Sequence, residues 1–418
     1  MRSPMSHRFD RRQAIRILAL GGSAAMLAAC SQTPTASPTA VPAQPTSVPK
    51  PTTAAAPVVA PSQAAAAAPA ASTAGAGVSD AEWQRIVDAA KGEATLALAT
   101  YSGTGFRDMV EAFKKAYPGI AVEHSQFQSS SRDYVPRLLQ EQKANLYTWD
   151  IAIMPTQEML RQVRPVNGID PIRPFIVRPD LLQDATWRDG FEGGFNDLER
   201  TMGYSIARDI ETQIWINTDQ VKPGEITKLD DLLDPKWRGK MVGGDPRTKG
   251  SAFVPTAMFR MITKSDDVVK KLWVDQEVVL GNDARQLTEF MVRGRYPVSV
   301  GAVDRRILAD FQEQGLGKNV ERVFIPGLEY TNAGSNTMWL ITRAPHPNAA
   351  RVFVNWVLSR EGSVVYSEQA QSNSRRVDVS PVEAETAMKP GVTYLKSDAE
   401  EFLDEMGKSQ EIAKALLN

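Results

Sequence analysis

Short apolar runs alternate with stretches of helical periodicity over most of this chain, and this alternation restricts the fold more than any other feature. The early runs that predict strands are Thr95–Tyr101, Ile120–His124 and Asp150–Met154. Two helices are predicted between them, one with Phe106, Met109, Val110, Phe113 and Tyr117 on a single face and one at Tyr134–Lys143. This order of elements predicts an α/β fold with a mostly parallel sheet flanked by helices.

The same rhythm returns after a proline- and glycine-rich interval at 165–194, which we interpret as an insertion or surface excursion. Later strands are predicted at Gln213–Asn217, Lys240–Val242, Tyr296–Val300 and Asn336–Thr342. Two further helices are predicted, one capped by Ser251 with Val254, Met258, Met261 and Ile262 buried, and one running from Pro347 to an end at Glu361-Gly362. The roughly 340 residues from Ser79 onward are enough for two lobes, each with its own core.

The first 29 residues have the features of an export signal. Arg11 and Arg12 precede an uncharged apolar stretch from Ile17 to Ala29, which is too short to span a bilayer. The arginine pair resembles a twin-arginine signal, and ordinary secretory export stays open as the alternative. The only cysteine, Cys30, follows Leu-Ala-Ala as in a bacterial lipobox. We therefore expect lipidation at Cys30, no disulfide, and attachment to the outer face of the cytoplasmic membrane.

A low-complexity tract follows the predicted lipidation site. Residues 30–78 consist almost entirely of Ser, Thr, Pro, Ala, Gln and Val, with no aromatic residue and a single charge at Lys50. Such a composition buries too little apolar surface to offset the conformational entropy of ordering the chain. We expect residues 30–78 to be a disordered tether that holds the globular part clear of the membrane.

The charge balance argues against a nucleic-acid partner. The signal holds five arginines and one aspartate, which leaves 43 basic and 48 acidic side chains in the mature chain. The three histidines, at positions 7, 124 and 346, have no motif partners for nucleophilic or metal chemistry. No catalytic residue, metal or cofactor is therefore predicted, and we do not expect an enzyme.

Four later segments, in order, resemble the extracellular solute-binding proteins of ABC importers, and in particular the family of the ferric-binding proteins. They are Asn217-Thr218, Leu229–Lys240 with Asp245-Pro246 after it, Ala344–Gly362, and Asn373–Asp378. The resemblance implies a two-lobed type II periplasmic-binding-protein fold with a ligand cleft between the lobes. It also implies a small-molecule solute, an ABC permease as partner, and a monomer.

The resemblance divides the globular part into three stretches. Lobe one is expected at 79–205 and lobe two at 206–333, and 334–418 is expected to return to lobe one and carry the C-terminal helices. Open α/β sheets bind ligands at the carboxyl ends of their strands, and closure of two lobes about a hinge buries a small solute. The solute is therefore expected between the lobes.

The segment Gly301–Arg306 is where this chain departs from the ferric-binding pattern. Family members typically carry neighbouring tyrosines here that bind iron, whereas this chain has Asp304, Arg305 and Arg306. Arginines repel a cation but present planar forks of donors that suit a carboxylate, phosphonate or phosphate ester. We therefore predict an anionic solute, with Asp304 orienting an arginine or binding a ligand amine or hydroxyl.

Other candidate ligand residues lie in loops that are expected to border the cleft. They are Tyr101, Ser102, Gly103 and Thr104 after the first strand, Arg247 and Ser251 before a helix, and Ser335 and Asn336 at the second hinge strand. Two of these loops open helices, whose first N–H groups attract anions. Ferric iron or a ferric chelate is the alternative solute, and a surface sensor or adhesion lipoprotein is a third possibility.

Overall fold

Two mixed β-sheets carry the fold in a computed structural model that describes residues 77–102, 104–248 and 253–417. The first sheet has the order β2-β1-β3-β13-β4, and β5 pairs with β13. Its strands are β1 (Thr95–Tyr101), β2 (Ala121–Phe127), β3 (Ile151–Ile153), β4 (Ile169–Asp170), β5 (Gly203–Ser205) and β13 (Thr337–Ile341). β1 runs parallel to β2 and β3, and β13 runs antiparallel to β3, β4 and β5.

The second sheet has the order β11-β7-β10-β8-β9. Its strands are β7 (Ile214–Asn217), β8 (Met241–Gly244), β9 (Val279–Gly281), β10 (Val298–Val300) and β11 (Val320–Arg322). β8 runs parallel to β9 and β10, and β7 runs antiparallel to β10 and β11. In each of these two sheets, one strand (β13 or β7) is antiparallel to its neighbours, and the other strands are parallel to one another. The mostly parallel sheets that the sequence predicted are therefore present.

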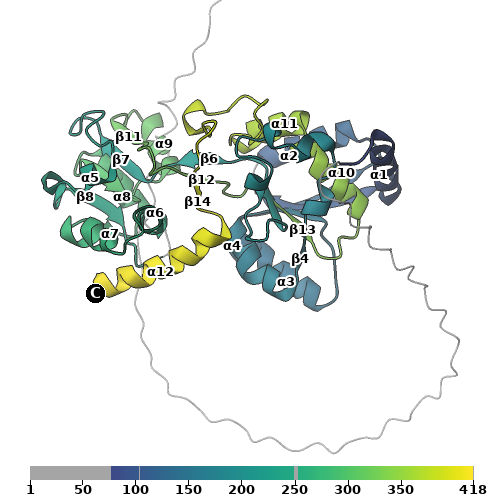
Figure 1. Ribbon diagram of the computed structural model, residues 1–418, viewed down its shortest axis with the longest axis horizontal. Coiled ribbons are helices and arrows are strands. Elements are labelled where there is room, and N and C mark those ends of the chain that lie inside the picture. Colours follow the sequence, from purple (N-terminus) through teal and green to yellow (C-terminus); the bar gives the residue numbers. More distant parts are fainter. Residues whose placement is uncertain (1–76, 103, 249–252, 418) are drawn as a thin grey trace, which may run out of the picture. The chain divides into compact units, whose positions relative to one another are not determined.

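A short third sheet consists of β6 (Asp209–Glu211), β12 (Tyr330–Asn332) and β14 (Leu395–Lys396), with β12 between the other two. β6 follows the first-sheet strand β5, and β12 precedes the first-sheet strand β13. The chain therefore leaves and re-enters the first sheet through this short sheet, which we call the hinge sheet (Figure 1). The expected lobe boundaries at 205 and 333 fall beside these strands and stay predictions.

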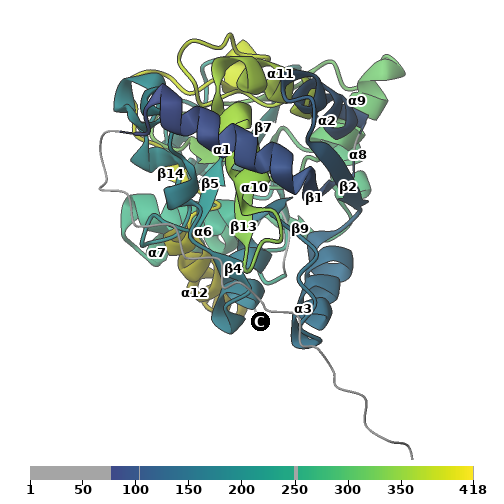
Figure 2. The same cartoon turned by 90° about the vertical axis from the view of Figure 1, so that its right-hand side faces the viewer.

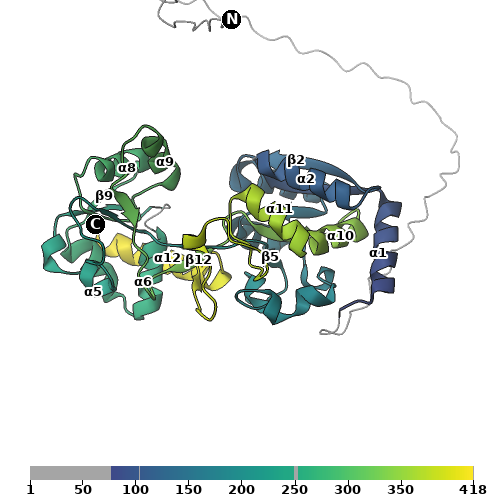
Figure 3. The same cartoon turned by 90° about the horizontal axis from the view of Figure 1, so that it is seen from above.

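Helices pack on both large sheets. Their bounds are α1 (Asp80–Glu93), α2 (Thr104–Ala116), α3 (Val135–Lys143), α4 (Thr156–Glu158), α5 (Leu229–Leu232), α6 (Phe253–Thr263), α7 (Asp267–Val269), α8 (Ala284–Val292), α9 (Arg305–Glu313), α10 (Pro347–Leu358), α11 (Arg360–Ala370) and α12 (Glu400–Leu416). α1 contacts α10 (Figure 2), and α2 contacts α11 (Figure 3). Among the described residues, no helix combines the length and apolar character that crossing a membrane requires.

Short helical turns complete the described elements. They are η1 (Ser130–Tyr134), η2 (Met159–Val163), η3 (Arg164–Val166), η4 (Arg173–Phe175), η5 (Pro179–Leu182), η6 (Asp184–Thr186), η7 (Glu192–Gly194), η8 (Pro235–Trp237), η9 (Lys270–Asp275) and η10 (Ala384–Thr386).

The predicted stripe of α2 is confirmed where its second and third turns meet the first sheet. Met109 and Phe113 are fully buried, and the Phe113 ring lies 5.2 Å from that of Phe353 on α10 in an edge-on contact. Burial of such aromatic surface contributes more free energy than any other term that holds helices on a sheet. The pattern of apolar spacing therefore located both the helix and the face that it buries.

Two predictions about element ends and exposure are wrong. The helix from Pro347 ends at Leu358 rather than at Glu361-Gly362, because the Ser359 hydroxyl accepts a hydrogen bond from the Gly362 N–H and caps a new helix, α11. A Cβ at Gly362 would lie 2.0 Å from the Trp356 carbonyl oxygen, so the glycine is there for close packing. The interval at 165–194 is not a surface excursion, because Phe175, Leu181, Trp187 and Phe191 are buried in the core.

The predicted stripe of α6 needs a smaller correction. Met258 is fully buried, but Val254, Met261 and Ile262 are only partly buried, and the fully buried neighbours of Met258 are Ala257 and Phe259. The C-terminal helix α12 contacts α6, which covers part of this side. The predicted signal, Cys30, residues 30–76 of the predicted tether and the Ser251 cap lie outside the described residues.

Candidate functional site

A cavity of about 360 Å³ opens where β3 ends and meets the hinge sheet. It is lined by Pro155, Thr156, Gln157, Val254, Asn332, Gly334, Ser335, Ser397, Asp398, Leu403 and Met406. The first three follow the carboxyl end of β3, which is where open α/β sheets bind ligands. Val254 comes from α6 after the second sheet, so the cavity, which we call the hinge cleft, is lined by residues that follow strands of both large sheets.

Hydroxyl and amide groups line the deep side of the hinge cleft. Asn196 lies behind it, and its Nδ2, which carries two hydrogens, is within hydrogen-bond distance of Thr156 Oγ1 (2.8 Å), Thr337 Oγ1 (3.0 Å) and Asp398 Oδ2 (3.0 Å). These side chains are nearly fully buried. Because buried polar groups are costly when unpaired, this network holds Thr156 and Asp398 in one orientation.

A buried ion pair supports the same wall. The Arg208 guanidinium has no exposed surface and donates from Nη1 to Asp398 Oδ1 (2.7 Å) and from Nη2 to Asn196 Oδ1 (2.6 Å). Arg208 precedes β6, and Asp398 follows β14, so the pair joins two strands of the hinge sheet. Arg208 therefore pairs with the Asp398 carboxylate on the side away from the cleft. The carboxylate that lines the hinge cleft already has a cationic partner.

Two further ionisable groups lie behind the hinge cleft. Burial, together with the charges of Arg208 and Arg375, lowers the pKa of Lys396 to about 8, against the opposing effects of Asp189 and Asp398. Arg375 is fully buried and donates to Asp189 Oδ1 from Nη2 (2.6 Å) and Nε (3.0 Å). With Lys396 protonated, this cluster holds three cations and two carboxylates.

The hinge loop places one of the predicted residues in the cleft. Ser335 lines the cavity directly after Gly334, whose φ of 56° is in the left-handed region that favours glycine. Its neighbour Asn336 is used by the fold, because it accepts from the Tyr366 hydroxyl (2.9 Å) and donates to Ser372 Oγ (3.1 Å).

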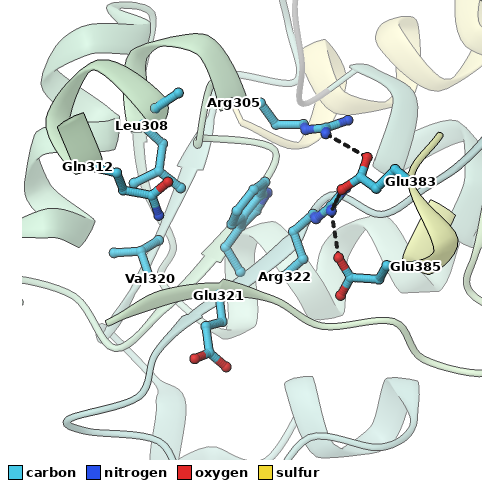
Figure 4. A pocket seen from close by; sticks show the side chains of 10 residues that line it. Arg305, Leu308, Gln312, Val320, Glu321, Arg322, Glu383 and Glu385 are labelled. Carbon is cyan, nitrogen blue, oxygen red and sulfur yellow. Dashed lines mark hydrogen bonds and ion pairs between the residues drawn. The ribbon is translucent and has the colours of Figure 1, made fainter. Parts of the chain in front are cut away.

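Arg305 lines a different cavity of about 390 Å³, shown in Figure 4, which also contains Trp215 and Arg322. Arg305 Nη2 donates to Glu383 (3.0 Å), and a second acid, Glu211, lies 3.7 Å away. Arg322 donates to Glu383 and Glu385, both at 2.6 Å. We call this the α9 cavity. Its arginines are engaged by acids at the start of η10, which lie 61 to 78 residues further along the chain.

The electrostatics of the α9 cavity follow from these pairs. Although burial raises it, the hydrogen bonds and charges of Arg322 and Arg305 hold the pKa of Glu383 below its usual range. Asp304 is the N-cap of α9, where its carboxylate accepts from the Arg306 and Ile307 N–H groups. The Arg306 side chain is exposed, and within the described residues it has no hydrogen-bond or ion-pair partner.

The remaining predicted residues lie elsewhere. Arg247 donates two parallel hydrogen bonds to Asp245 and a third to the Leu417 carbonyl oxygen (2.8 Å). Its guanidinium therefore contacts the C-terminal end of α12. Tyr101 ends β1 half-buried, the Ser102 N–H donates to the Phe127 carbonyl, and Thr104 opens α2. Gly103, Ser251 and the Thr104 side chain lie outside the described part of the chain.

Residues 97–364 match the family of bacterial extracellular solute-binding proteins. This chain belongs to that family. The predicted resemblance is thereby confirmed, and the protein is a solute-binding protein of the kind that serves an ABC permease outside the cytoplasm. Membership favours binding over catalysis as its task. No curated protein matches this sequence.

Solved structures confirm the two-lobed type II fold of the solute-binding protein. An extracellular solute-binding protein from Bordetella parapertussis matches with a TM-score of 0.58 and 13% identity, over 78% of this chain and 100% of that one. A Trichodesmium protein in complex with iron and citrate matches with a TM-score of 0.54 and 15% identity, over 77% and 99%. The PotD spermidine/putrescine-binding protein of Streptococcus pneumoniae matches with a TM-score of 0.52 and 13% identity, over 78% and 99%.

Most of the hinge-cleft residues of this solute-binding protein were not predicted from the sequence. Pro155, Thr156 and Gln157 follow a strand that was predicted, so the rule that ligands bind at carboxyl ends of strands was sufficient to find them. Ser397 and Asp398 carried no local signal, because they reach the cleft only through the pairing of β14 with β12.

The described residues contain no group of three or more His, Cys, Asp or Glu side chains placed to hold a metal ion. Four of the nine tyrosines, Tyr134, Tyr204, Tyr330 and Tyr366, are almost fully buried. Burial raises the pKa of the Tyr204 hydroxyl to about 12, which disfavours the anionic form that binds ferric iron.

Proposed function

We propose that this solute-binding protein captures a small, polar, anionic solute in the hinge cleft and delivers it to an ABC permease. The observation that carries the proposal is the charge behind the cleft wall. In the described chain, Arg208, Arg375 and Lys396 face two carboxylates, the buried Asp398 and the partly exposed Asp189. An uncompensated buried cation favours a nearby anion, because the low dielectric of the interior weakens screening.

The lining of the hinge cleft supports a solute with several oxygen atoms. Thr156, Gln157, Asn332, Ser335 and Ser397 offer hydroxyl and amide groups. Such groups orient carboxylate, phosphonate or phosphate oxygens without adding charge. Pro155, Val254 and Met406 supply apolar contact for a carbon skeleton, so an organic anion suits the cavity better than an inorganic one.

Of the two arginines in the Gly301–Arg306 segment, Arg306 is the one that we propose contacts the solute. Its guanidinium has no partner in the described chain, whereas Arg305 is engaged by Glu383. Type II binding proteins close two lobes on a solute, and such closure brings loops of the second lobe toward the first. We propose that Arg306 contacts the anion in the closed state and that Arg305 contributes little.

A neutral, hydroxyl-rich solute is the second candidate. It is favoured by the lining itself, because none of the described residues that line the hinge cleft is a lysine or arginine. A ferric chelate stays in the same class as the anionic proposal, since a similar fold is found in complex with iron and citrate. Lipid anchoring at Cys30, export by the predicted signal and a sensing role remain proposals.

The experiment is a thermal-shift screen of the full chain against citrate, glycerol phosphate, methylphosphonate, ferric chloride, ferric citrate and neutral sugars. A solute that binds only the native state raises the melting temperature. We expect a shift with one class of anion that carries a single carboxylate, phosphonate or phosphate group, lost in Ser335→Phe, reduced in Arg306→Ala, and kept in Arg85→Ala, which removes an exposed arginine of α1.

Three outcomes would contradict the proposal in different ways. A shift with neutral sugars alone would replace the anion by the second candidate. A shift with plain ferric iron would mean that oxygen ligands other than a tyrosine pair hold a metal. A shift with an anion of one acidic group that survives Ser335→Phe would place that anion outside the hinge cleft.

A further inference from the structure

A second cavity lies on the opposite side of the hinge sheet from the hinge cleft. It has a volume of about 420 Å³, and Arg188, Arg200 and Lys396 are the cations that line it. We propose that this cavity, which we call the back cavity, is a separate binding site for a small organic anion with two or three carboxylate or phosphate groups. The site is distinct from the hinge cleft and does not depend on what the cleft binds.

The hinge sheet itself forms the wall between the two cavities. Thr331 pairs with Lys396 across β12 and β14, and both line the back cavity. The next residue in each case, Asn332 at the end of β12 and Ser397 directly after β14, lines the hinge cleft instead, and the Asn332 amide donates to Ser397 Oγ (2.8 Å). Side chains alternate across a strand, so one pair of strands presents a different face to each cavity.

The two acids that line the back cavity already have arginine partners. Asp189 binds Arg375 through Nη2 at 2.6 Å, and Glu192 accepts two hydrogen bonds from Arg173. Neither acid pairs with a lining cation. Three positive charges therefore face a cavity whose carboxylates are neutralised by other residues.

The lining cations have donors to spare. Arg188 has five N–H groups, and the single side-chain hydrogen bond it makes in the described chain runs from Nη2 to the Val379 carbonyl (3.1 Å). Arg200 has no side-chain partner among the described residues. Lys396 gives two of its three ammonium hydrogens to the Gly193 and Phe195 carbonyls, at 2.6 and 3.4 Å.

The charge and walls of the back cavity define the ligand. Charge-assisted hydrogen bonds from arginine to carboxylate or phosphate are the strongest available here, and three cations match a multiply charged anion. Met388, Val392 and Tyr394 add apolar wall, which suits a carbon skeleton. A neighbouring hollow of about 320 Å³ shares Arg200 and Lys396 with the back cavity and is also lined by the acids Asp197, Glu400 and Glu401, so the anion is expected on the Arg188 side.

Calorimetric titration of the full chain with citrate, in chloride buffer of constant ionic strength, tests the proposal. Arg200→Gln removes a guanidinium without a protein partner, so folding is expected to be unaffected. Loss of charge-assisted hydrogen bonds should weaken citrate binding about tenfold. Arg85→Gln is the charge-matched control, and Ser335→Phe blocks only the hinge cleft. Both should bind citrate at the back cavity as the parent does.

Several results would overturn the proposal. If the full chain binds neither citrate nor inorganic phosphate, the back cavity is not an anion site of this class. Equal weakening in Arg200→Gln and Arg85→Gln would mean that only general charge attraction is present. If Ser335→Phe abolishes citrate binding while Arg200→Gln leaves it intact, the anion binds in the hinge cleft, as the proposed function states.

Discussion

The α9 cavity and the back cavity are both lined by arginines, yet their electrostatics are opposite. In the α9 cavity, Arg305 and Arg322 are bound by Glu383 and Glu385, which leaves no arginine without a carboxylate. In the back cavity, Arg200 and Lys396 have no carboxylate partner in the described chain.

The difference shows that an arginine marks an anion site only where the protein's own acids leave it free. Glu383 competes directly with any incoming carboxylate for Arg305, and it is held at high local concentration by the chain. A ligand must then displace it and leave a carboxylate without its cation, which costs free energy. The back cavity carries no such penalty.

The largest effect is expected where the buried ion pair separates the hinge cleft from the back cavity. Asp398→Ala leaves the fully buried Arg208 guanidinium without its carboxylate, and removal of one partner of a buried pair destabilises a protein by about 3–5 kcal/mol. Urea denaturation measures the change. Asp404→Ala is the control, because the Asp404–Arg161 pair is exposed and should contribute under about 1 kcal/mol.

Equal losses in the two variants would mean that Arg208 finds water or another acid once Asp398 is gone. The comparison of a cleft lined by a paired carboxylate, Asp398, with a cationic back cavity would then lose its basis.

An intermediate effect is expected from pH at the back cavity. Burial first, and then Arg208 and Arg375, lower the pKa of Lys396 to about 8, while Asp189 and Asp398 oppose them. Lys396 is therefore charged below pH 8 and neutral well above it, whereas citrate keeps its charge from pH 7 to 9. Citrate affinity should fall several-fold as pH rises through 8, with proton uptake on binding.

Calorimetry in buffers of different ionisation enthalpy measures that uptake. Lys396→Met should remove the pH dependence, and Arg200→Gln should keep it. A parent chain whose citrate affinity does not change between pH 7 and 9 would show that Lys396 does not contact the anion.

The smallest effect is expected when the α9 cavity is made more like the back cavity. Glu383→Gln takes one carboxylate from both Arg305 and Arg322, but Glu385 and Glu211 stay near them. We expect weak citrate binding to appear, measured in an Arg200→Gln background so that the back cavity is silent. If no binding appears, the remaining acids, rather than Glu383 alone, keep anions out.

Much of the fold was predictable because its signals are local. The β1 strand at Thr95–Tyr101 was located to the residue, and the buried face of α2 followed from apolar spacing alone. The end of α10 at Leu358 was not predicted. A glycine after an apolar helix is typical of a helix terminus, but here Ser359 caps a new helix, α11, and Gly362 packs tightly within its first turn.

The candidate site was only partly predictable. Ser335 lines the hinge cleft, as the order of elements implied. Thr156 could have been predicted as well, because it follows the carboxyl end of the predicted strand β3. Arg305 looked like a free cation because Glu383, which engages it, lies 78 residues further along the chain. No local pattern links the two residues.

The sequence by itself determined the class of fold and the family, because hydrophobic periodicity and short motifs depend on neighbouring residues. Only the tertiary structure decided which charges are matched. Arg208 meets Asp398 across 190 positions, and Lys396 and Ser397 are separated into two cavities by the pairing of β14 with β12. Charge compensation is a property of distance in space, and only the folded chain sets those distances.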